Sequence, residues 1–141
     1  MNDTENDTET AEVKSGAGSV LLVDDDKFLI DMYSLKFRNA RYTVQACLSA
    51  KDALELLRGG LQVDAIVFDI LMPEMEGFKF LEVLRDEKLG AGAVLVSLTN
   101  QANDFEKKRA EDLGCVRYIV KASMIPSEVV EAVKEEIAKK K

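Results

Sequence analysis

The sequence predicts an α/β domain in which five parallel strands alternate with five helices in a doubly wound sheet. From Ser19 onward, short apolar runs rich in Val, Ile and Leu alternate with longer segments whose apolar residues recur every three or four positions. The first pattern is typical of buried strands and the second of amphipathic helices. Because strands and helices alternate regularly, we expect a (βα)5 arrangement.

The first half of this pattern contains three strands and two helices. We expect the strands at 20–23, 42–47 and 65–68, and the helices at 27–39 and 50–58. The second strand is the most polar, which favours an edge position, whereas the third is continuously apolar and belongs in the centre. The first helix takes its apolar positions from Phe28, Ile30, Met32, Leu35 and Phe37.

The second half continues the alternation to the end of the chain. A helix follows Gly77, strands are expected at 93–98 and 116–120, and a further helix lies between them at 103–113. The last helix begins near Pro126, a residue well suited to a first helical turn. Its apolar positions are Val129, Val130, Val133 and Ile137. The order of the strands in the sheet does not follow from these periodicities.

Composition excludes several classes of function. The chain has 141 residues, 47% of them hydrophobic, which is enough for one domain with a substantial core. Its 19 basic and 26 acidic residues give a formal charge of −7, which disfavours nucleic acid as a direct partner. The sequence has no histidine, which excludes Ser-His-Asp and Cys-His catalytic sites and His-ligated zinc.

The N-terminal segment differs in composition from the rest. Residues 1–17 are acidic and polar, so we expect a disordered tail followed by one domain over 18–141. The longest nearly apolar run, 91–98, is too short to cross a membrane, and the N-terminus does not resemble a signal peptide. Cys47 and Cys115 are expected to be buried free thiols, which agrees with a cytoplasmic location.

Residues that handle charge or phosphate follow four of the predicted strands. In a parallel sheet these strand ends lie along one edge, so their side chains should converge on one crevice. Part of this cluster has a simpler explanation, because the third acid of the first group can cap the helix that follows. The residues are Asp24, Asp25, Asp26, Asp69, Thr99 and Lys121.

This set of side chains indicates a metal-assisted phosphoryl site. Adjacent carboxylates repel one another unless a cation lies among them, so Asp24 and Asp25 are candidate ligands of a hard divalent ion, preferably Mg²⁺. A third carboxylate, Asp69, could attack phosphorus and form an acyl phosphate. Lys121 and the ion would spread the transition-state charge, and the Thr99 hydroxyl could bond a phosphoryl oxygen.

The four motifs that carry these residues resemble those of the receiver domain of two-component response regulators. They are VLLVDDD, FDILMPEMEG, VSLTN and YIVKA, and their key residues are spaced 45, 30 and 22 positions apart. The resemblance covers about Ser19 to Lys139. It implies a flavodoxin-like sheet of order 2-1-3-4-5, with the crevice where the strand order reverses between strands one and three.

The resemblance also implies a role for each acidic residue. Asp69 would be the phosphoacceptor. Asp25, Asp69 and the backbone carbonyl of Leu71 would bind Mg²⁺ directly, and Asp24 would act on the ion largely through water. These roles are carried over from the family's motif onto the matching positions of this chain.

Three further positions match the family's phosphate-binding and switch residues. Thr99 and Lys121 would bind the phosphoryl group, and Tyr118 would be the aromatic switch residue that turns inward when Thr99 is drawn to the phosphate. A half-buried strand tyrosine without that role is the alternative for Tyr118. The surface that responds to phosphorylation in this family lies on the fourth helix, fifth strand and fifth helix.

The implied function is that of a single-domain response regulator. A histidine kinase or a histidine phosphotransfer protein would donate the phosphoryl group, and a downstream protein would be the target, without nucleic acid or membrane. We expect a phosphoacceptor rather than an enzyme, with intrinsic autodephosphorylation left open. No output domain follows Lys141, so the expected output is protein binding or phosphorelay transfer, unless the chain is a fragment. A monomer is expected, and a phosphorylation-dependent dimer is left open.

Two alternatives compete with this interpretation. A pseudo-receiver would keep the fold as an interaction module that works without phosphorylation. A phosphatase of the haloacid dehalogenase type would also place Asp-x-Asp after a strand, as Asp24 and Asp26 do, but Phe28 stands where that motif has Thr or Val.

Two departures from the family pattern flank the site. Ala122 follows Lys121 where most receiver domains have proline, often in a cis bond; a cis bond before alanine would cost about 2.5–4 kcal/mol, so we expect a trans or a strained loop. Asn100 and Gln101 follow Thr99, where a small residue is common. With Leu71, they border the path of water to the aspartyl phosphate, so the sequence does not predict the phosphate lifetime.

Overall fold

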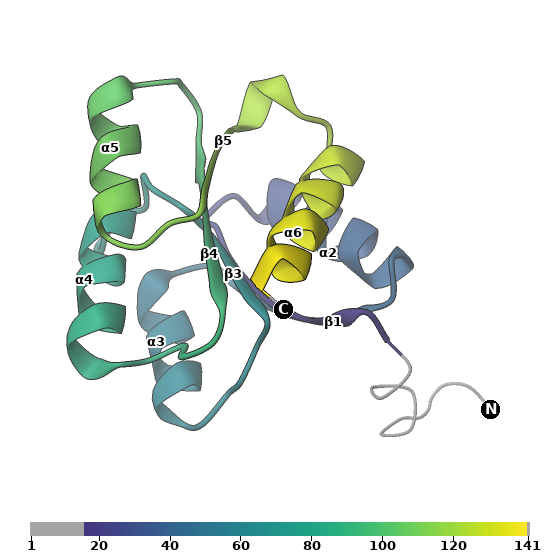
Figure 1. Cartoon of the computed structure of the whole chain (residues 1–141), viewed down its shortest axis with the longest axis horizontal. Coiled ribbons are helices and arrows are strands. Elements are labelled where there is room, and N and C mark those ends of the chain that lie inside the picture. The colour runs from purple at the N-terminus through teal and green to yellow at the C-terminus, as the bar shows by residue number, and fades with distance from the viewer. Residues whose placement is uncertain (1–15, 141) are drawn as a thin grey trace.

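The computed structural model describes residues 16–140, so most of the expected N-terminal tail lies outside the described residues. Strands and helices alternate as expected along the described chain (Figure 1). The elements are β1 (Gly18–Val23), α2 (Lys27–Asn39), β2 (Tyr42–Cys47), α3 (Ala50–Arg58), β3 (Ala65–Asp69), α4 (Gly77–Glu87), β4 (Val94–Thr99), α5 (Asp104–Asp112), β5 (Arg117–Val120), the short 3-10 helix η1 (Lys121–Ser123) and α6 (Pro126–Lys140).

All strand pairs in the sheet are parallel, and the strand order is β2-β1-β3-β4-β5. This confirms the expected order 2-1-3-4-5 and the flavodoxin-like fold. The polar strand β2 lies at an edge, and the entirely buried β3 lies at the centre, as its continuous apolar sequence predicted. The strand order reverses between β1 and β3, so loops leave these two strands in opposite directions and open a crevice at their carboxyl ends.

The helices form two layers, one on each face of the sheet (Figure 1). On one face, α2 and α6 cover β-strand residues such as Leu22, Val67 and Val96. On the other face, α3 and α4 pack on Leu21 and Phe68, and α5 adds its one buried residue, Ala110. Because successive strand residues point to opposite faces, each central strand contributes to both cores.

The first helix differs from expectation in its buried face. Ile30 and Phe37 reach the core as predicted, but Phe28 is 75% exposed and Leu35 is 57% exposed. Each residue turns a helix by about 100°, so Phe28 lies about 200° around the helix from Ile30 and points to solvent. The buried stripe is completed instead by Tyr33 and Ser34.

The loop between β3 and α4 closes tightly behind Asp69. The Gly77 N–H donates to the Ile70 carbonyl at 2.7 Å. A Cβ at this glycine would lie 2.8 Å from Ile70 Cα and 2.9 Å from the Asp69 carbonyl oxygen. Gly77 therefore permits the close approach that holds the backbone of Asp69 in place.

The two cysteines are buried free thiols, which confirms the sequence prediction. Burial raises the pKa of Cys115 to about 12, so its thiol stays protonated at neutral pH. Across residues 16–140, every helix is too short or too polar to cross a membrane.

Candidate functional site

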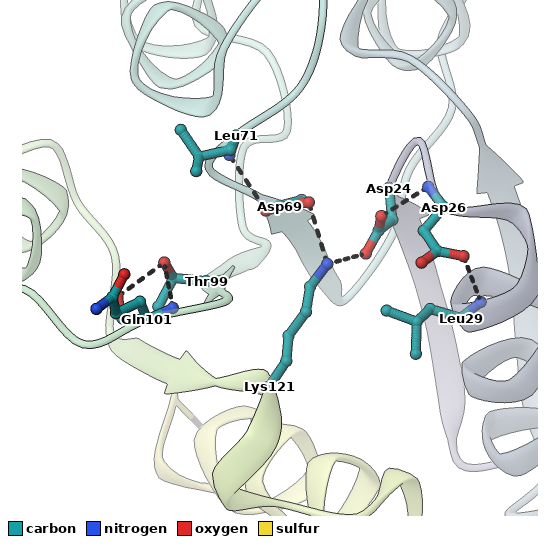
Figure 2. Close-up of polar contacts among 8 residues, drawn as sticks. All are labelled: Asp24, Asp26, Leu29, Asp69, Leu71, Thr99, Gln101 and Lys121. Atoms are coloured by element: carbon teal, nitrogen blue, oxygen red, sulfur yellow. Dashed lines mark hydrogen bonds and ion pairs between the residues drawn. The ribbon is translucent and has the colours of Figure 1, made fainter.

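Lys121 joins two buried carboxylates at the carboxyl end of the sheet. Asp24 follows β1 and is 1% exposed, while Asp69 ends β3 and is 3% exposed. The Lys121 Nζ lies 2.8 Å from Asp24 Oδ2 and 3.1 Å from Asp69 Oδ2. Figure 2 shows this side chain reaching from the end of β5 between the two acids. The order of the strands in the sheet thus brings charged side chains from the ends of β1, β3 and β5 together in one crevice.

Backbone hydrogen bonds orient both carboxylates. Asp24 Oδ1 accepts from the Asp26 N–H at 2.9 Å, and Asp69 Oδ1 accepts from the Leu71 N–H at 3.1 Å. Asp26 itself caps α2, since its Oδ1 accepts from the Leu29 N–H at 3.1 Å (Figure 2). The second oxygen of each buried acid is therefore the one that faces the crevice and Lys121.

Burial and charge act in opposite directions on this cluster. Burial raises the pKa of Asp69 above its usual range, and the nearby Lys121 ammonium offsets only part of that effect. For Lys121, burial lowers the pKa, but the Asp24 and Asp69 carboxylates outweigh it and raise the pKa above its ordinary value. Lys121 is therefore charged at neutral pH.

Three carboxylates are placed to share one ion. Asp24, Asp25 and Asp69 each offer an oxygen, and these oxygens all lie within 4.8 Å of one another. Asp25 is exposed, so the cluster is open to solvent on one side. The buried Asp24 Oδ2 has the Lys121 ammonium 2.8 Å away as its ion-pair partner. An all-oxygen, anionic donor set that is open to solvent on one side fits a hard divalent cation such as Mg²⁺.

Thr99 ends β4 next to the cluster but bonds elsewhere. Its hydroxyl donates to the Gln101 carbonyl at 3.2 Å (Figure 2), and it is not bonded to Asp69 or Lys121. It borders a hollow of about 440 Å³ that is lined mainly by polar residues. The lining residues are Leu71, Thr99, Asn100, Gln101, Ala102, Asn103 and Glu106.

Tyr118 lies on the same face of the sheet as Thr99. It pairs in register with Ser97, two residues before Thr99, and side chains two apart in a strand share a face. Its hydroxyl contacts the start of α5, at 3.2 Å from Glu106 Oε1 and 3.5 Å from the Asn103 carbonyl oxygen. Burial raises the pKa of Tyr118, so its hydroxyl remains a donor at neutral pH.

Comparison with known proteins identifies the family. The model of the response regulator receiver domain matches residues 20–134, which reach from β1 into α6. The chain belongs to the receiver domain family. Receiver domains are phosphoacceptor signalling domains of two-component systems. They interact with histidine kinases or phosphotransfer proteins and bind Mg²⁺ at an acidic pocket.

Curated relatives are longer than this receiver domain. The response regulator SaeR of Staphylococcus epidermidis and that of Staphylococcus aureus are each 31% identical to it over 111 residues, which is 79% of this chain and 46% of theirs. The chain therefore spans about half the length of the curated relatives it matches.

Solved structures match the receiver domain over most of its length. A CheY-like receiver domain protein from Methanospirillum hungatei aligns with a TM-score of 0.78 at 24% identity, covering 86% of this chain and 94% of that one. The chemotaxis response regulator CheY4 of Vibrio cholerae aligns with a TM-score of 0.74 at 25% identity, covering 84% and 97%. Because the Methanospirillum hungatei protein is only 24% identical to this chain, that likeness shows the fold alone.

Most residues expected at the site do meet there. Asp24, Asp25, Asp69 and Lys121 form one cluster, and the Leu71 backbone adjoins it through its N–H. All peptide bonds among residues 16–140 are trans, so the bond before Ala122 is the expected trans alternative, and Lys121 starts the turn η1. Lys121 reaches both acids without the proline that is common in the family.

Two residues near the site were not singled out in the sequence. Tyr33 is buried on α2 close enough for Lys121 and the acids to affect its pKa, which burial raises. Its place on the buried face of α2 could have been found from the spacing with Ile30 and Phe37. Glu106, the partner of Tyr118, follows Asn103 by three residues, which is the spacing of a helix-capping pair.

Proposed function

We propose that this receiver domain accepts a phosphoryl group on Asp69 from a phosphohistidine of a histidine kinase or phosphotransfer protein. The observation that carries the proposal is the position of Asp69. It is buried, held by the Leu71 N–H, paired with the Lys121 ammonium, and within 4.8 Å of Asp24 and Asp25 oxygens. A carboxylate with such neighbours is suited to carry a second negative group, because compensating charge is already in place.

The proposed transfer to Asp69 replaces one bond to phosphorus with another. One carboxylate oxygen forms a bond to phosphorus as the bond between phosphorus and the donor's imidazole nitrogen breaks, and the electron pair stays on that nitrogen. Asp69 Oδ2 faces the crevice, whereas Oδ1 is engaged by the Leu71 N–H. Burial excludes most water from this carboxylate, which strengthens the attraction between the reacting group and the Lys121 ammonium.

Asp24, Asp25 and Asp69 are the residues that would hold Mg²⁺, and the Leu71 carbonyl is a further candidate ligand. When bound, the ion supplies positive charge that neutralises phosphoryl oxygens during transfer. Asp24 also orients the site without an ion, since it holds the Asp26 N–H and lies beside Lys121. Repulsion among these acids favours any conformation or ligand that places a cation between them.

Thr99 and Lys121 would bind the phosphoryl group once it is on Asp69. Lys121 already contacts the acceptor, whereas the Thr99 hydroxyl would have to exchange the Gln101 carbonyl for a phosphoryl oxygen. Asn100 and Gln101 line the hollow through which water would reach the acyl phosphate, so they would influence its autodephosphorylation. Tyr118, on the same face as Thr99, would be the switch residue.

A protein-binding surface that changes with phosphorylation would provide the output. We infer a single-domain regulator whose surface on α5, β5 and α6 binds a downstream protein, with no nucleic-acid partner because the chain carries a net charge of −7. We further propose a cytoplasmic, monomeric protein. The longer relatives leave a further domain in the intact protein as the alternative.

Labelling by acetyl phosphate tests the assignment of Asp69. Wild-type protein should gain one phosphoryl group by intact mass when Mg²⁺ is present, and Asp69→Ala should gain none. Asp31→Asn is the matched control, because Asp31 is an exposed acid that pairs with Lys27 away from the site. Undiminished labelling of Asp69→Ala would reject the assignment, an unlabelled wild type would favour a pseudo-receiver, and turnover of a generic phosphate ester would favour a phosphatase.

A further inference from the structure

A cluster of three cations lies where α2 ends and β2 begins. Lys36 and Arg38 are in the last turn of α2, and Arg41 is the residue before β2. All three are exposed, and within residues 16–140 none of them forms an ion pair. The other arginines of the chain each pair with a carboxylate; they are Arg58, Arg85, Arg109 and Arg117.

The end of the helix explains only part of this positive charge. Basic residues in a last helical turn are favourable, because the carboxyl end of a helix carries about half an elementary negative charge. Three full positive charges exceed that amount, and Arg41 lies beyond the helix. Cations gathered at one end of a helix repel one another, so this cluster favours an anionic partner.

Arg41 also has an uncommon backbone conformation. Its φ is 76°, in the left-handed region where glycine is favoured because a side chain there costs free energy. The geometry of this turn thus favours glycine, whereas the sequence supplies a guanidinium. The choice of arginine is explained if its side chain makes a contact that offsets the cost.

An acidic stretch of the sequence leads into this cluster. The Ala17 N–H donates to the Arg41 carbonyl at 3.0 Å, so the chain enters the domain beside the cations. Residues 1–15 lie outside the described part of the chain, and their sequence contains one lysine and five acids. The acids are Asp3, Glu5, Asp7, Glu9 and Glu12. Five residues separate Glu12 from Ala17 and can span about 18 Å at most, so Glu12 is well within reach of the cluster.

We propose that residues 3–12 bind to the cluster of Lys36, Arg38 and Arg41 within the same chain. Carboxylates of the segment pair with the ammonium and guanidinium groups, and the short connection through Ala17 keeps their effective concentration at about the millimolar level. Each exposed ion pair is weak, but several pairs on one tether act together. The contact depends on charge and reach alone, and it requires no regular structure in the segment.

The proposed contact lies far from the phosphoacceptor. Arg41 adjoins the start of β2, whereas Asp69 is the last residue of β3, and a strand of this length spans about 17–20 Å. The inference is therefore independent of the proposed function. Its consequence is competition, because an anionic molecule would have to displace the acidic segment before it could bind these cations.

A nitroxide spin label at position 8 tests the contact in the full chain. Thr8→Cys supplies the thiol for the label, because Cys47 and Cys115 are buried and burial raises the pKa of both. In about 0.01 M salt, the amide signals of residues 36–41 should lose intensity beyond the background that tethering alone causes. In about 1 M salt the excess loss should disappear, because the Debye length falls from about 30 Å to about 3 Å.

Neutralisation of the cluster separates docking from tethering. A labelled chain that carries Lys36→Gln, Arg38→Gln and Arg41→Gln should show in low salt only the background loss that the unsubstituted cluster shows in high salt. The tether is the same length in both chains, so any excess loss at residues 36–41 reports the contact itself.

The matched control removes the same charge from the opposite face of the sheet. Lys51, Lys79 and Lys107 are exposed residues of α3, α4 and α5, and none of them forms an ion pair within residues 16–140. A labelled chain with all three changed to Gln should retain the excess loss at residues 36–41.

Signal loss at residues 36–41 that is equal in low and high salt would overturn the proposal. An equal reduction by the cluster variant and by the control would overturn it too, since net charge alone would then explain the effect. Signal loss in an isotope-enriched chain mixed with a separate spin-labelled chain would place the contact on a second copy and would also contradict it. Circular dichroism of each variant checks folding, and the salt titration of the unsubstituted cluster decides the question even if a variant unfolds.

Discussion

Lys121 is the residue on which the balance of charge in the crevice depends. Its ammonium compensates Asp24 and Asp69, both of which are nearly inaccessible to water. A buried pair of like charges without a cation is unfavourable, so either this lysine or a bound ion is needed to stabilise the two carboxylates. The contributions of the lysine and of a bound ion to stability can therefore be measured separately.

Lys121→Ala should lower the free energy of unfolding by about 2–4 kcal/mol without Mg²⁺, because it leaves two buried carboxylates uncompensated. Addition of Mg²⁺ should recover a larger part of the stability in this variant than it adds to wild type. Urea denaturation with and without the ion measures both quantities. Equal stabilisation of the two proteins by Mg²⁺ would show that lysine and metal do not share the same carboxylates.

At the scale of single residues, the sequence predicted the acids better than their partners. Asp24, Asp25 and Asp69 follow directly from strand ends, because the backbone position determines where they lie. The hydrogen bond from Thr99 to Gln101 and the one from Tyr118 to Glu106 depend on side-chain rotamers. Rotamers respond to local packing that no periodicity in the sequence encodes.

Elements were predicted well where apolar spacing and capping residues agree. In α3, for example, Ser49 caps the start, and Ala53, Leu54 and Leu57 are buried on one face. The turn η1 was not predicted, because the family pattern has proline where this chain has Ala122. The buried Glu136 on α6 was also missed, although it follows Val133 by three residues on the apolar face.

Gly77→Ala should destabilise the domain by about 1–3 kcal/mol, because the added Cβ would overlap Ile70 Cα and the Asp69 carbonyl. The displaced backbone should also slow labelling of Asp69. Glu76→Ala is the matched control, since Glu76 is the neighbouring N-cap residue and makes no side-chain capping bond. Chemical denaturation and acetyl phosphate labelling of both variants provide the measurement. Wild-type labelling of Gly77→Ala would argue against a role for this close contact at the site.

Glu136 joins α6 to β5 through Arg117, with Nη1 at 2.9 Å from Oε2. Burial alone would raise the pKa of Glu136, but the hydrogen bonds from Arg117 and Lys139 outweigh it and lower the pKa. The stabilisation is therefore present above the ordinary glutamate pKa, and it is lost as pH falls through the lower folded-state pKa.

Glu136→Gln should lower the stability by about 1–2 kcal/mol at neutral pH, and the difference from wild type should shrink as the pH falls below about 4. Thermal melts across this pH range measure the difference. Glu135→Gln is the control, because Glu135 contacts the same guanidinium at 3.2 Å but is largely exposed. A difference between Glu136→Gln and wild type that grows toward acid would contradict the assignment.

For the whole molecule, topology brings the site together. The sequence alone predicted five strands that alternate with helices, but the order β2-β1-β3-β4-β5 came from the family resemblance, because apolar periodicity does not specify which strands are neighbours. Once the order is known, the crevice between β1 and β3 and its three acids follow from the parallel arrangement. We propose that this crevice makes Asp69 a phosphoryl carrier.

Chemical mapping of the acyl phosphate tests that claim most directly. Protein labelled by acetyl phosphate with Mg²⁺ is reduced with borohydride, which converts an aspartyl phosphate to homoserine, and its peptides are sequenced by mass spectrometry. We expect homoserine at position 69, and none in the unlabelled protein. Homoserine at another aspartate, or at none in protein that has gained a phosphoryl group, would contradict the account.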